Sequence, residues 1–440
     1  MKRLTHPDLK KPQYRAWIDF LKKSERWNAS RIRKYQLKEL KRVVSHAYEN
    51  SAGYRALFDK AGIKPNMIKS LDDIRRLPFV SKEILRDNVD LYRTPSKNAD
   101  YVTTGGSTGI PFGFYRDKGA FAKELASKAF QYYRMGWKEG CRQMLLRGLT
   151  IPSKSHMRLY PAFGELRCSS YHLTPDSMEA YRKRAWKYKP DFLKCYPSSG
   201  YIFAQFLKEN GKTFPPIKGV LCASENLYDF QKKAMVDAFK CRIFSHYGHY
   251  EMAVLAGFCE HKDTLHVLPQ YGYAELLDKK GNPVTKPGEI GEIVGTSFIN
   301  NATPFIRYKT RDMAVFKSFG CPSCGRPYQI WERVEGRLQE FIVTSTERLI
   351  SMTAVNMHDD IFDTIKQFQF FQEKKGHVIF NFIPKESFKD GDRESIRKRL
   401  QAKLGDDITI TMRQVNDIPP TKRGKHRFLI QKLDLKYGNE

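Results

Sequence analysis

The sequence predicts an α/β fold: a large part with mainly parallel sheets, helices and a β-rich subdomain, followed by a small α+β unit. Three observations lead to this class. The chain has 440 residues, too many for one ordinary hydrophobic core. Short apolar strands alternate with helices through its middle, which favours parallel pairing. From about residue 264 to 335, turn residues separate β-rich runs, and the residues that follow show a third pattern.

The first 95 residues or so are expected to be helical. One stretch has apolar residues at spacings of three and four, which indicates a helix with one buried face. Ser70 and Ser81 each precede a short helical pattern, so each is expected to cap a helix. The apolar face consists of Leu37, Leu40, Val43, Val44 and Ala47.

The middle of the chain supplies the alternation. Helices are expected at 118–136 and at Pro175–Tyr188, and apolar runs such as QMLLRGL, DFLKCY, KGVLCAS and CRIFSHYG are expected to be strands. Further on, YGYAELL and GNPVTKPGEIGEIVGTSF indicate hairpins.

The end of the chain predicts a separate small unit. It contains the strand FIVTS, a helix near 355–365, two more strands and a basic helix at 391–404. The boundary falls near Arg337 to Phe341. We therefore expect a helical N-terminal part of the large domain, a core with the β-rich subdomain, and a small C-terminal domain. Their bounds are 1–95, 96–338 and 339–440.

The charge is strongly positive, since 77 Lys and Arg against 48 Asp and Glu give +29. Nucleic acid, a membrane face, an acidic polymer or a phosphorylated cofactor can use such a field. No recognition module accompanies the charge, which disfavours specific nucleic-acid binding. No run of about 18 apolar residues and no secretory signal is present, so we expect a cytoplasmic protein.

A loop rich in Thr, Gly and Ser is the first candidate binding segment. It is expected between a strand and a helix, where backbone N–H groups and hydroxyls can hold phosphate oxygens. The lysine of a P-loop is missing, which disfavours a P-loop NTPase, and a plain turn is the alternative. The candidate residues are Thr103, Thr104, Gly105, Gly106, Ser107, Thr108 and Gly109.

Two further segments carry candidate ligands for a nucleotide. In SHYGHYE, Tyr247 and Gly248 follow an apolar strand; an aromatic can stack on a base while Glu251 holds Mg²⁺. The alternative is a strand end with a capping Glu. In PFIRYKTRDMA, Asp312 can accept two ribose hydroxyls. The alternative there is a surface turn that pairs Asp312 with Arg311.

Two basic residues lie near the proposed small domain. Arg337 stands in VEGRLQEFI at the domain junction. Lys425 stands in IPPTKRGKHRFLI, an exposed turn that is either a plain basic tail or a mobile cation delivered to a phosphate site.

Taken in order, these segments resemble the AMP-forming adenylating (ANL) superfamily, and within it the phenylacetate–CoA ligase family and its capsular-polysaccharide-locus (CapK-type) branch. YGHYE is similar to the family's YGxTE, with Tyr250 in place of Thr. RYKTRD is similar to RYxTGD, with Arg311 in place of Gly. GRLQE resembles the hinge segment, TKRGKHR the lysine loop, and LCASENLYD the segment beside adenine. VNMHDD and FQFFQE resemble the capsule-locus branch more than the phenylacetate enzymes.

The resemblance implies a ligase that adenylates an acid with ATP and passes the acyl group to an acceptor. The glycine loop would hold the β- and γ-phosphates, and Glu251 would position Mg²⁺. Asp312 and Arg337 would fix the ribose. Lys425 would bridge the carboxylate and the α-phosphate, and the small domain would rotate about Gln339. The residues implied beside adenine are Tyr247, Ser224 and Glu225.

The acceptor and the acid stay open at this stage. CoA is the expected acceptor, and an amine of a surface polysaccharide is the alternative, with peripheral association with a membrane or polysaccharide machinery. A third reading is a degenerate nucleotide-binding scaffold in polymer assembly, which the departures Tyr250, Arg311 and Phe112 favour.

The cysteines predict a metal site. CPSCG places Cys321 and Cys324 at the spacing of half a zinc knuckle, and FCEHKDTLHV can complete it with Cys259 and either His261 or His266. The resemblance favours His266, because relatives carry the histidine in an LH pair. Four protein ligands would make the zinc structural. A CxxC turn with free thiols is the alternative.

Overall fold

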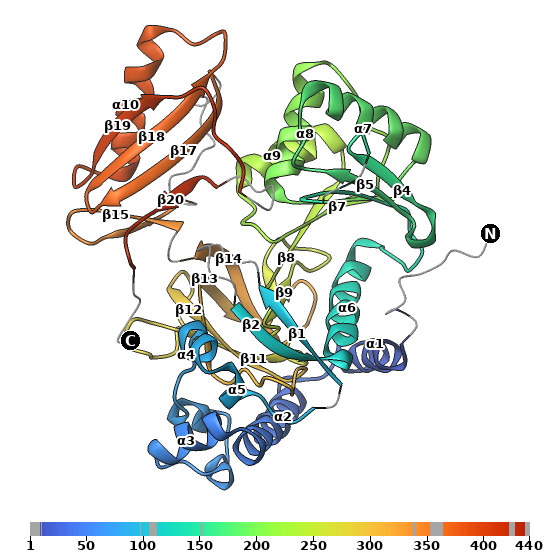
Figure 1. Cartoon of the computed structure of the whole chain (residues 1–440), viewed down its shortest axis with the longest axis vertical. Coiled ribbons are helices and arrows are strands. Elements are labelled where there is room, and N and C mark those ends of the chain that lie inside the picture. The colour runs from blue at the N-terminus through green and yellow to red at the C-terminus, as the bar shows by residue number, and fades with distance from the viewer. Residues whose placement is uncertain are drawn as a thin grey trace. The chain divides into compact units, whose positions relative to one another are not determined.

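The structure is a computed structural model, and it describes residues 9, 11–96, 98–104, 112–149, 151, 153–337, 340–352, 364–421 and 427–435. The chain forms two compact units. The first contains Met1–Gly140 and Phe244–Val334, and the second contains Cys141–Ile243 and Glu335–Glu440. Figure 1 labels many of the elements of the two units, and the mixed α/β class predicted from the sequence is confirmed.

The first unit begins with helices, as the sequence predicts. The face of α2 that contains Leu40, Val43, Val44 and Ala47 is buried. Ser81 caps α4, since its hydroxyl accepts from the Ile84 N–H. The α-helices are α1 (Pro12–Ser24), α2 (Ala29–Asn50), α3 (Ala52–Lys60), α4 (Lys82–Asp87), α5 (Val89–Tyr92) and α6 (Lys118–Tyr132).

Ser70 does not cap a helix, contrary to expectation. The short 3-10 helix starts at Asp72, and Ser70 instead donates its N–H and its hydroxyl to the Asp73 carboxylate, at 2.7 and 3.0 Å. A charged carboxylate is a stronger hydrogen-bond acceptor than a serine hydroxyl, so Asp73, and not Ser70, accepts the backbone N–H group here.

In the first unit, antiparallel pairing joins β11 with β12, β12 with β13, β14 with β10, β10 with β9, and β9 with β8. They lie in the order β11-β12-β13-β14-β10-β9-β8. The predicted hairpin-rich region therefore forms a meander, joined by the short strands β9 and β10. These strands are β8 (Arg242–Gly248), β9 (Leu255–Gly257), β10 (Leu265–Val267), β11 (Gly272–Leu277), β12 (Ile290–Ser297), β13 (Tyr308–Phe319) and β14 (Gln329–Arg337).

A separate hairpin, β1 (Ala99–Thr104) with β2 (Phe112–Asp117), flanks the glycine loop. The expectation of a strand followed directly by a helix is wrong here, because β2 intervenes before α6. Phe112 and Phe114 of β2 are fully buried, so the aromatic run after the loop is a core strand.

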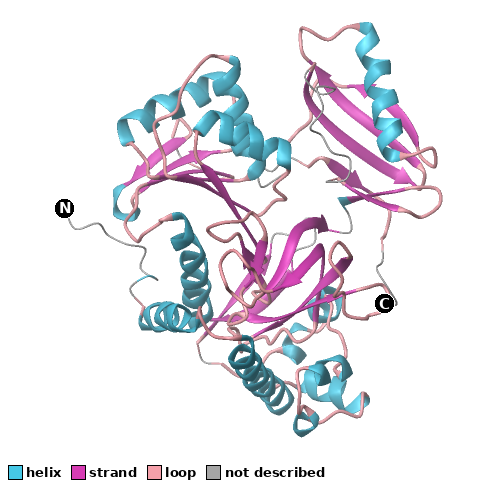
Figure 2. Ribbon diagram, turned by 180° about the vertical axis from the view of Figure 1, so that it is seen from behind, coloured by secondary structure: helices cyan, strands magenta, loops and turns pink. Residues whose placement is uncertain are grey.

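The second unit contains the predicted alternation of strands and helices. Its strands lie in the order β7-β6-β3-β5-β4, and β5, β3, β6 and β7 pair in parallel. Figure 2 shows helices lying over these strands. The elements are β3 (Gln143–Arg147), β4 (Met157–Tyr160), β5 (Glu165–Ser169), α7 (Pro175–Tyr188), β6 (Phe192–Cys195), α8 (Pro197–Glu209), β7 (Gly219–Ala223) and α9 (Asp229–Phe239).

The C-terminal part of the second unit is an α+β fold. Helix α10 packs Ile396, Leu400 and Leu404 on a sheet of order β19-β18-β17-β20. Most of the helix expected near 355–365 lies outside the described residues, and β17 begins at Ile365. The elements are β15 (Phe341–Val343), β16 (Leu349–Ser351), β17 (Ile365–Lys374), β18 (His377–Pro384), α10 (Asp390–Leu404), β19 (Thr409–Gln414) and β20 (Leu429–Gln431). Among the described helices, none is long and apolar enough to cross a bilayer.

Candidate active site and metal centre

The end of β8 and the start of β13 bring two predicted nucleotide-binding residues together. The Tyr247 hydroxyl donates to Asp312 Oδ2 at 2.7 Å. Trp331 of β14 packs edge-on against the Tyr247 ring, with centroids 5.8 Å apart. Asp312 is 8% exposed, and its N–H donates to Thr310 Oγ1 at 3.1 Å. These contacts hold the carboxylate in place.

Glu251 lies in the turn after β8 and is held by two donors. The Tyr308 hydroxyl donates to its Oε1 at 3.1 Å, and His249 Nδ1 lies 3.2 Å from its Oε2. The Val254 N–H donates to His249 Nε2 at 3.2 Å, so the neutral imidazole carries its proton on Nδ1 and donates it to Glu251. Sequence reasoning missed Tyr308 and took His249 for a structural polar group, although both lie inside the motifs that identify Asp312 and Glu251.

Gly248, between these residues, has a steric reason to be glycine. A Cβ there would lie 2.9 Å from Leu255 Cδ1, on the neighbouring strand β9. Sequence reasoning placed Gly248 beside the nucleotide, and the structure places it at the exposed end of β8.

Arg311 departs from the family pattern, and the structure shows its setting. Its backbone has φ +62°, the left-handed region that glycine occupies at little cost. The Arg311 guanidinium lies 3.4 Å from the Glu83 carboxylate of α4. The backbone N–H of Arg311 donates to the Glu292 carboxylate at 3.2 Å. The Arg311 side chain thus pairs with the Glu83 carboxylate, and the Asp312 carboxylate accepts from Tyr247.

In the second unit, Ser224 and Glu225 follow β7. Ser224 has φ +73°, a sharp turn at the strand end. Glu225 accepts from the Ser198 N–H at 3.0 Å and from the Ser198 hydroxyl at 3.1 Å, at the start of α8. The carboxyl ends of parallel strands are the usual place for ligands in open α/β sheets.

Several predicted site residues cannot be placed. Thr103 is exposed and lies near the end of β1. Residues 105–109 of the glycine loop lie outside the described part of the chain. The same holds for the expected hinge and lysine, and for the side chains of Thr104 and Arg337. The residues concerned are Gly105, Gly106, Ser107, Thr108, Gly109, Gln339 and Lys425.

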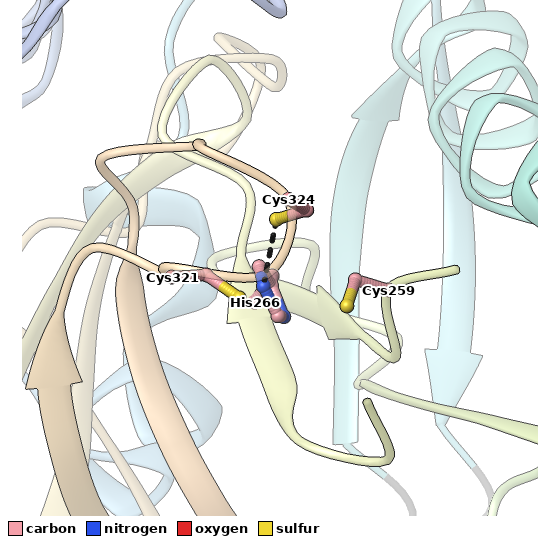
Figure 3. A group of neighbouring side chains, drawn as sticks. All are labelled: Cys259, His266, Cys321 and Cys324. Atoms are coloured by element: carbon pink, nitrogen blue, oxygen red, sulfur yellow. Dashed lines mark hydrogen bonds between the residues drawn. The ribbon is translucent and has the colours of Figure 1, made fainter. Parts of the chain in front are cut away.

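The candidate metal ligands meet in the first unit (Figure 3). One ligand atom from each of Cys259, His266, Cys321 and Cys324 lies within 4.8 Å of every other. Cys324 Sγ is 3.4 Å from His266 Nε2. Of the two candidate histidines, the structure places the His266 side chain with the three cysteines. The backbone N–H of His261 donates to Cys259 Sγ.

The surroundings of His266 suit a ligand. Its Nδ1 lies 3.0 Å from the Thr264 carbonyl oxygen, so Nδ1 carries the proton and Nε2 turns its lone pair toward the thiols. Burial lowers the pKa of His266 to about 4, which keeps the imidazole neutral at pH 7. A Cys₃His donor set at this separation fits tetrahedral zinc.

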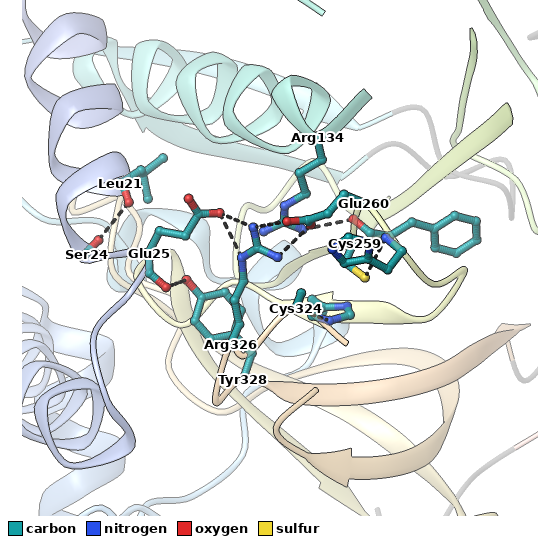
Figure 4. A network of polar contacts seen from close by, with 12 residues as sticks. Leu21, Ser24, Glu25, Arg134, Cys259, Glu260, Cys324, Arg326 and Tyr328 are labelled. Carbon is teal, nitrogen blue, oxygen red and sulfur yellow. Dashed lines mark hydrogen bonds and ion pairs between the residues drawn. The ribbon is translucent and has the colours of Figure 1, made fainter. Parts of the chain in front are cut away.

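A charged network surrounds the cluster (Figure 4). Arg326 donates to Glu25, just after α1, at 2.6 Å and to Glu260 at 2.7 Å. Burial opposes ionisation of Glu260, but its bonds to Arg326 hold its pKa at about 2. Through Arg326, the network connects the segment after the Cys321–Cys324 turn to the end of α1. This connection favours a structural role for the cluster.

The second unit contains a cavity of about 1330 Å³ lined by α8, α9 and β17. Its lining contains both aromatic and basic side chains. Two of the lining lysines pair with lining acids, Lys233 with Asp237 and Lys385 with Glu209. The lining includes Tyr201, Phe206, Phe230, Phe368 and Phe428, together with Lys208, Lys212, Lys233, Lys240, Lys366 and Lys385.

The fold of this chain is that of solved CoA ligases. A 2-hydroxyisobutyryl-CoA ligase bound to 2-HIB-AMP superposes with a TM-score of 0.77 over 93% of this chain and 92% of that one, at 19% identity.

Sequence comparison gives the particular relatives. CapK of Staphylococcus aureus is 25% identical over 90% of this chain and 89% of its own length. The phenylacetate-coenzyme A ligase of Thermus thermophilus is 22% identical over 92% of this chain and 97% of its own. The CapK C-terminal domain family model matches residues 342–432. The predicted resemblance is confirmed: the chain is similar to CapK and to phenylacetate-coenzyme A ligases over most of its length.

Proposed function

We propose that this protein is an AMP-forming acid ligase, which activates a carboxylate with ATP and transfers the acyl group to CoA. The observation that carries the proposal is a pair of hydrogen bonds between two motifs. The YGHYE and RYKTRD segments, read separately from the sequence, are joined by the Tyr247–Asp312 and Tyr308–Glu251 hydrogen bonds.

The reaction needs positioning and charge neutralisation more than proton transfer. Tyr247 offers a ring to the adenine, and Asp312 offers acceptors to the ribose hydroxyls. Ser224, Glu225 and Arg337 complete the nucleotide contacts in the proposal. The loop Thr103–Gly109 donates N–H groups and hydroxyls to the β- and γ-phosphates.

Glu251 suits Mg²⁺, because it is an oriented carboxylate and magnesium prefers oxygen ligands. When bound, Mg²⁺ neutralises charge that develops on the phosphates. His249 and Tyr308 hold the Glu251 carboxylate in one orientation through their two hydrogen bonds.

Lys425 supplies the cation that the glycine loop lacks, and rotation about Gln339 withdraws it after adenylation. Lys425→Ala should lower ATP–pyrophosphate exchange by orders of magnitude while sparing acyl transfer from a preformed acyl-adenylate. Equal loss in both half-reactions would contradict this role. The first experiment is pyrophosphate exchange over aromatic, fatty, hydroxy and amino acids. ATP binding without any exchange would favour the scaffold reading.

The basic cavity of the second unit supports CoA as acceptor, because CoA carries phosphates and a base that lysines and aromatic rings can hold. Lys208, Lys212, Lys240 and Lys366 have no ion pair with any residue the structure describes. Replacing Lys366 by Ala should raise the KM for CoA several-fold and leave exchange with pyrophosphate intact. Product formation with amino sugars but not with CoA would instead select the amine acceptor and the surface-polysaccharide role. We propose a cytoplasmic site of action, where ATP and CoA are available.

We also propose a structural zinc at Cys259, His266, Cys321 and Cys324. The support is the closeness of the four ligand atoms and the orientation of His266 Nε2. Four protein ligands leave no open position for a substrate. Metal analysis of protein purified without chelator should find about one zinc per chain, and less than about 0.2 would remove the proposal.

A further inference from the structure

Helix α2 has a row of basic side chains on its exposed face. Their spacings of three, four and three residues put them on one side of the helix, along about 15 Å of its axis. The opposite face packs on the core, where Leu40, Val43 and Ala47 are buried. This basic row consists of Arg31, Lys34, Lys38 and Lys41, all of them exposed.

No carboxylate pairs with the basic row: none of its four members has an ion pair with any residue that the structure describes. Helix α2 contains two acids. Glu39 is half-buried and pairs with Arg42 at 2.7 Å. Glu49 lies eight residues beyond Lys41, about 12 Å along the axis, which exceeds the Debye length of about 8 Å in physiological salt.

The segment around the row is basic as a whole. Residues 22–41 contain eight Lys and Arg against two Glu. Both acids are already bound, Glu39 by Arg42 and Glu25 by Arg326. The positive charge of this segment is therefore directed to solvent.

This charge pattern works against the helix itself. Side chains of like charge repel at spacings of three and four residues. The first turn of α2 contains Arg31 and no acid, although a helix N-terminus favours negative charge. The capping residue, Asn28, is neutral. An external anionic partner would relieve these repulsions together.

The form of the row favours an anionic surface over a single anion or a polymer chain. It lies on the convex side of a helix, and three of its four members are lysines. A lysine ammonium is a point charge without the planar fork that arginine offers to one phosphate. Arg31 lies over the Trp27 ring, 4.5 Å from its centroid, and Trp27 packs against Tyr35. Tryptophan beside basic residues is typical of membrane–water interfaces.

We propose that the basic row is a docking surface for a membrane that contains anionic phospholipids. The apolar face of α2 is buried in the protein, so the helix lies on the headgroups and does not insert. Each basic residue near such a surface adds to the binding, and its contribution fades within a Debye length. The inference goes beyond the ligase function and does not depend on it.

The test is co-sedimentation of the full chain with phosphatidylcholine vesicles, with and without about 30% phosphatidylglycerol. Wild type should bind the anionic vesicles and not the neutral ones, and raising the salt from about 0.1 to 0.5 M should weaken binding at least 10-fold. Glutamine keeps the helix propensity, so the row variant carries four glutamines. Its partition constant should fall at least about 30-fold. The substitutions are Arg31→Gln, Lys34→Gln, Lys38→Gln and Lys41→Gln.

The matched control removes the same four charges from exposed lysines of α3, α7 and α10. It should bind anionic vesicles within about threefold of wild type, because only the net charge has changed. An equal loss in the two variants would overturn the inference, as would equal binding of wild type to neutral vesicles, or no binding. The control substitutions are Lys60→Gln, Lys183→Gln, Lys187→Gln and Lys398→Gln.

Two further measurements keep the test decisive. If the row variant does not fold, Lys34→Gln combined with Lys38→Gln replaces it, with an expected loss of at least about fivefold. Amine labelling of Lys34 and Lys38 in wild type should fall several-fold when anionic vesicles are added, while labelling of Lys398 stays constant. Unchanged labelling of the row would overturn the inference. Tighter row-dependent binding to polygalacturonate or duplex DNA than to vesicles, at equal charge concentration, would also overturn it and select a polymer.

Discussion

The Tyr247 hydroxyl donates to Asp312 Oδ2 at 2.7 Å, across 65 residues of chain. The bond joins the residue proposed to lie against adenine to the carboxylate proposed to hold the ribose. It orients Asp312 before a nucleotide arrives, which lowers the ordering cost of binding.

Tyr247→Phe keeps the ring and removes the hydroxyl that donates this bond. A hydrogen bond to a charged group is worth about 1.5–3 kcal/mol, so kcat/KM for ATP should fall roughly 10- to 100-fold. Tyr250→Phe is the control, because Tyr250 is 44% exposed and its hydroxyl accepts from Arg116 at 3.3 Å. Equal effects of both substitutions would contradict the role of the Tyr247–Asp312 bond.

His249 should act on Mg²⁺ dependence through Glu251. His249→Asn places an amide N–H near the position of Nδ1, whereas His249→Gln reaches the position of Nε2. We therefore expect the apparent Mg²⁺ affinity in pyrophosphate exchange to fall about 10-fold in the Gln variant and to be largely restored in the Asn variant. The same loss in both variants would show that orientation by Nδ1 is not what matters.

Cys324→Ser should remove the zinc and lower the Tm by about 5 °C or more, since the metal joins two separate segments. The cluster draws on the β9–β10 region and on the turn between β13 and β14. Cys141→Ser, at a half-buried cysteine outside the cluster, should change neither zinc content nor Tm by a comparable amount. Full zinc occupancy in Cys324→Ser would contradict the ligand set.

Arg311 occupies a backbone conformation that favours glycine. Arg311→Gly and Arg311→Ala both remove the ion pair with Glu83, but only the alanine keeps a Cβ at φ +62°. The glycine variant should be more stable than the alanine variant by about 1 kcal/mol in urea unfolding. The reverse order would show that the left-handed backbone carries no strain at this position.

Asp407 should make the stability of the C-terminal part depend on pH. Hydrogen bonds from Arg348 and then Thr346 hold the Asp407 pKa well below 3.8. A carboxyl whose pKa is lowered on folding stabilises the protein above its unfolded pKa, and this contribution is lost as the pH falls. The Tm difference between wild type and Asp407→Asn should therefore be largest above pH 5 and narrow toward pH 3. A constant difference would contradict the assignment.

Sequence patterns predicted much of this site, but not its contacts. The Cys and His spacing left His261 and His266 open, and the register of β10 between β9 and β14 decided for His266. The glycine loop was expected to precede a helix, since the aromatic run of β2 does not reveal by itself that it pairs with β1.

The sequence by itself determined the fold class, the order of the motifs and the residue types that can hold a nucleotide or a metal. These follow from local periodicity, turn chemistry and spacing, which short stretches of chain contain in full. Only the tertiary structure decided which donor meets which acceptor: Tyr247 with Asp312, and Tyr308 with Glu251. Such contacts depend on strand order and register, which bring distant segments together and which no single segment encodes.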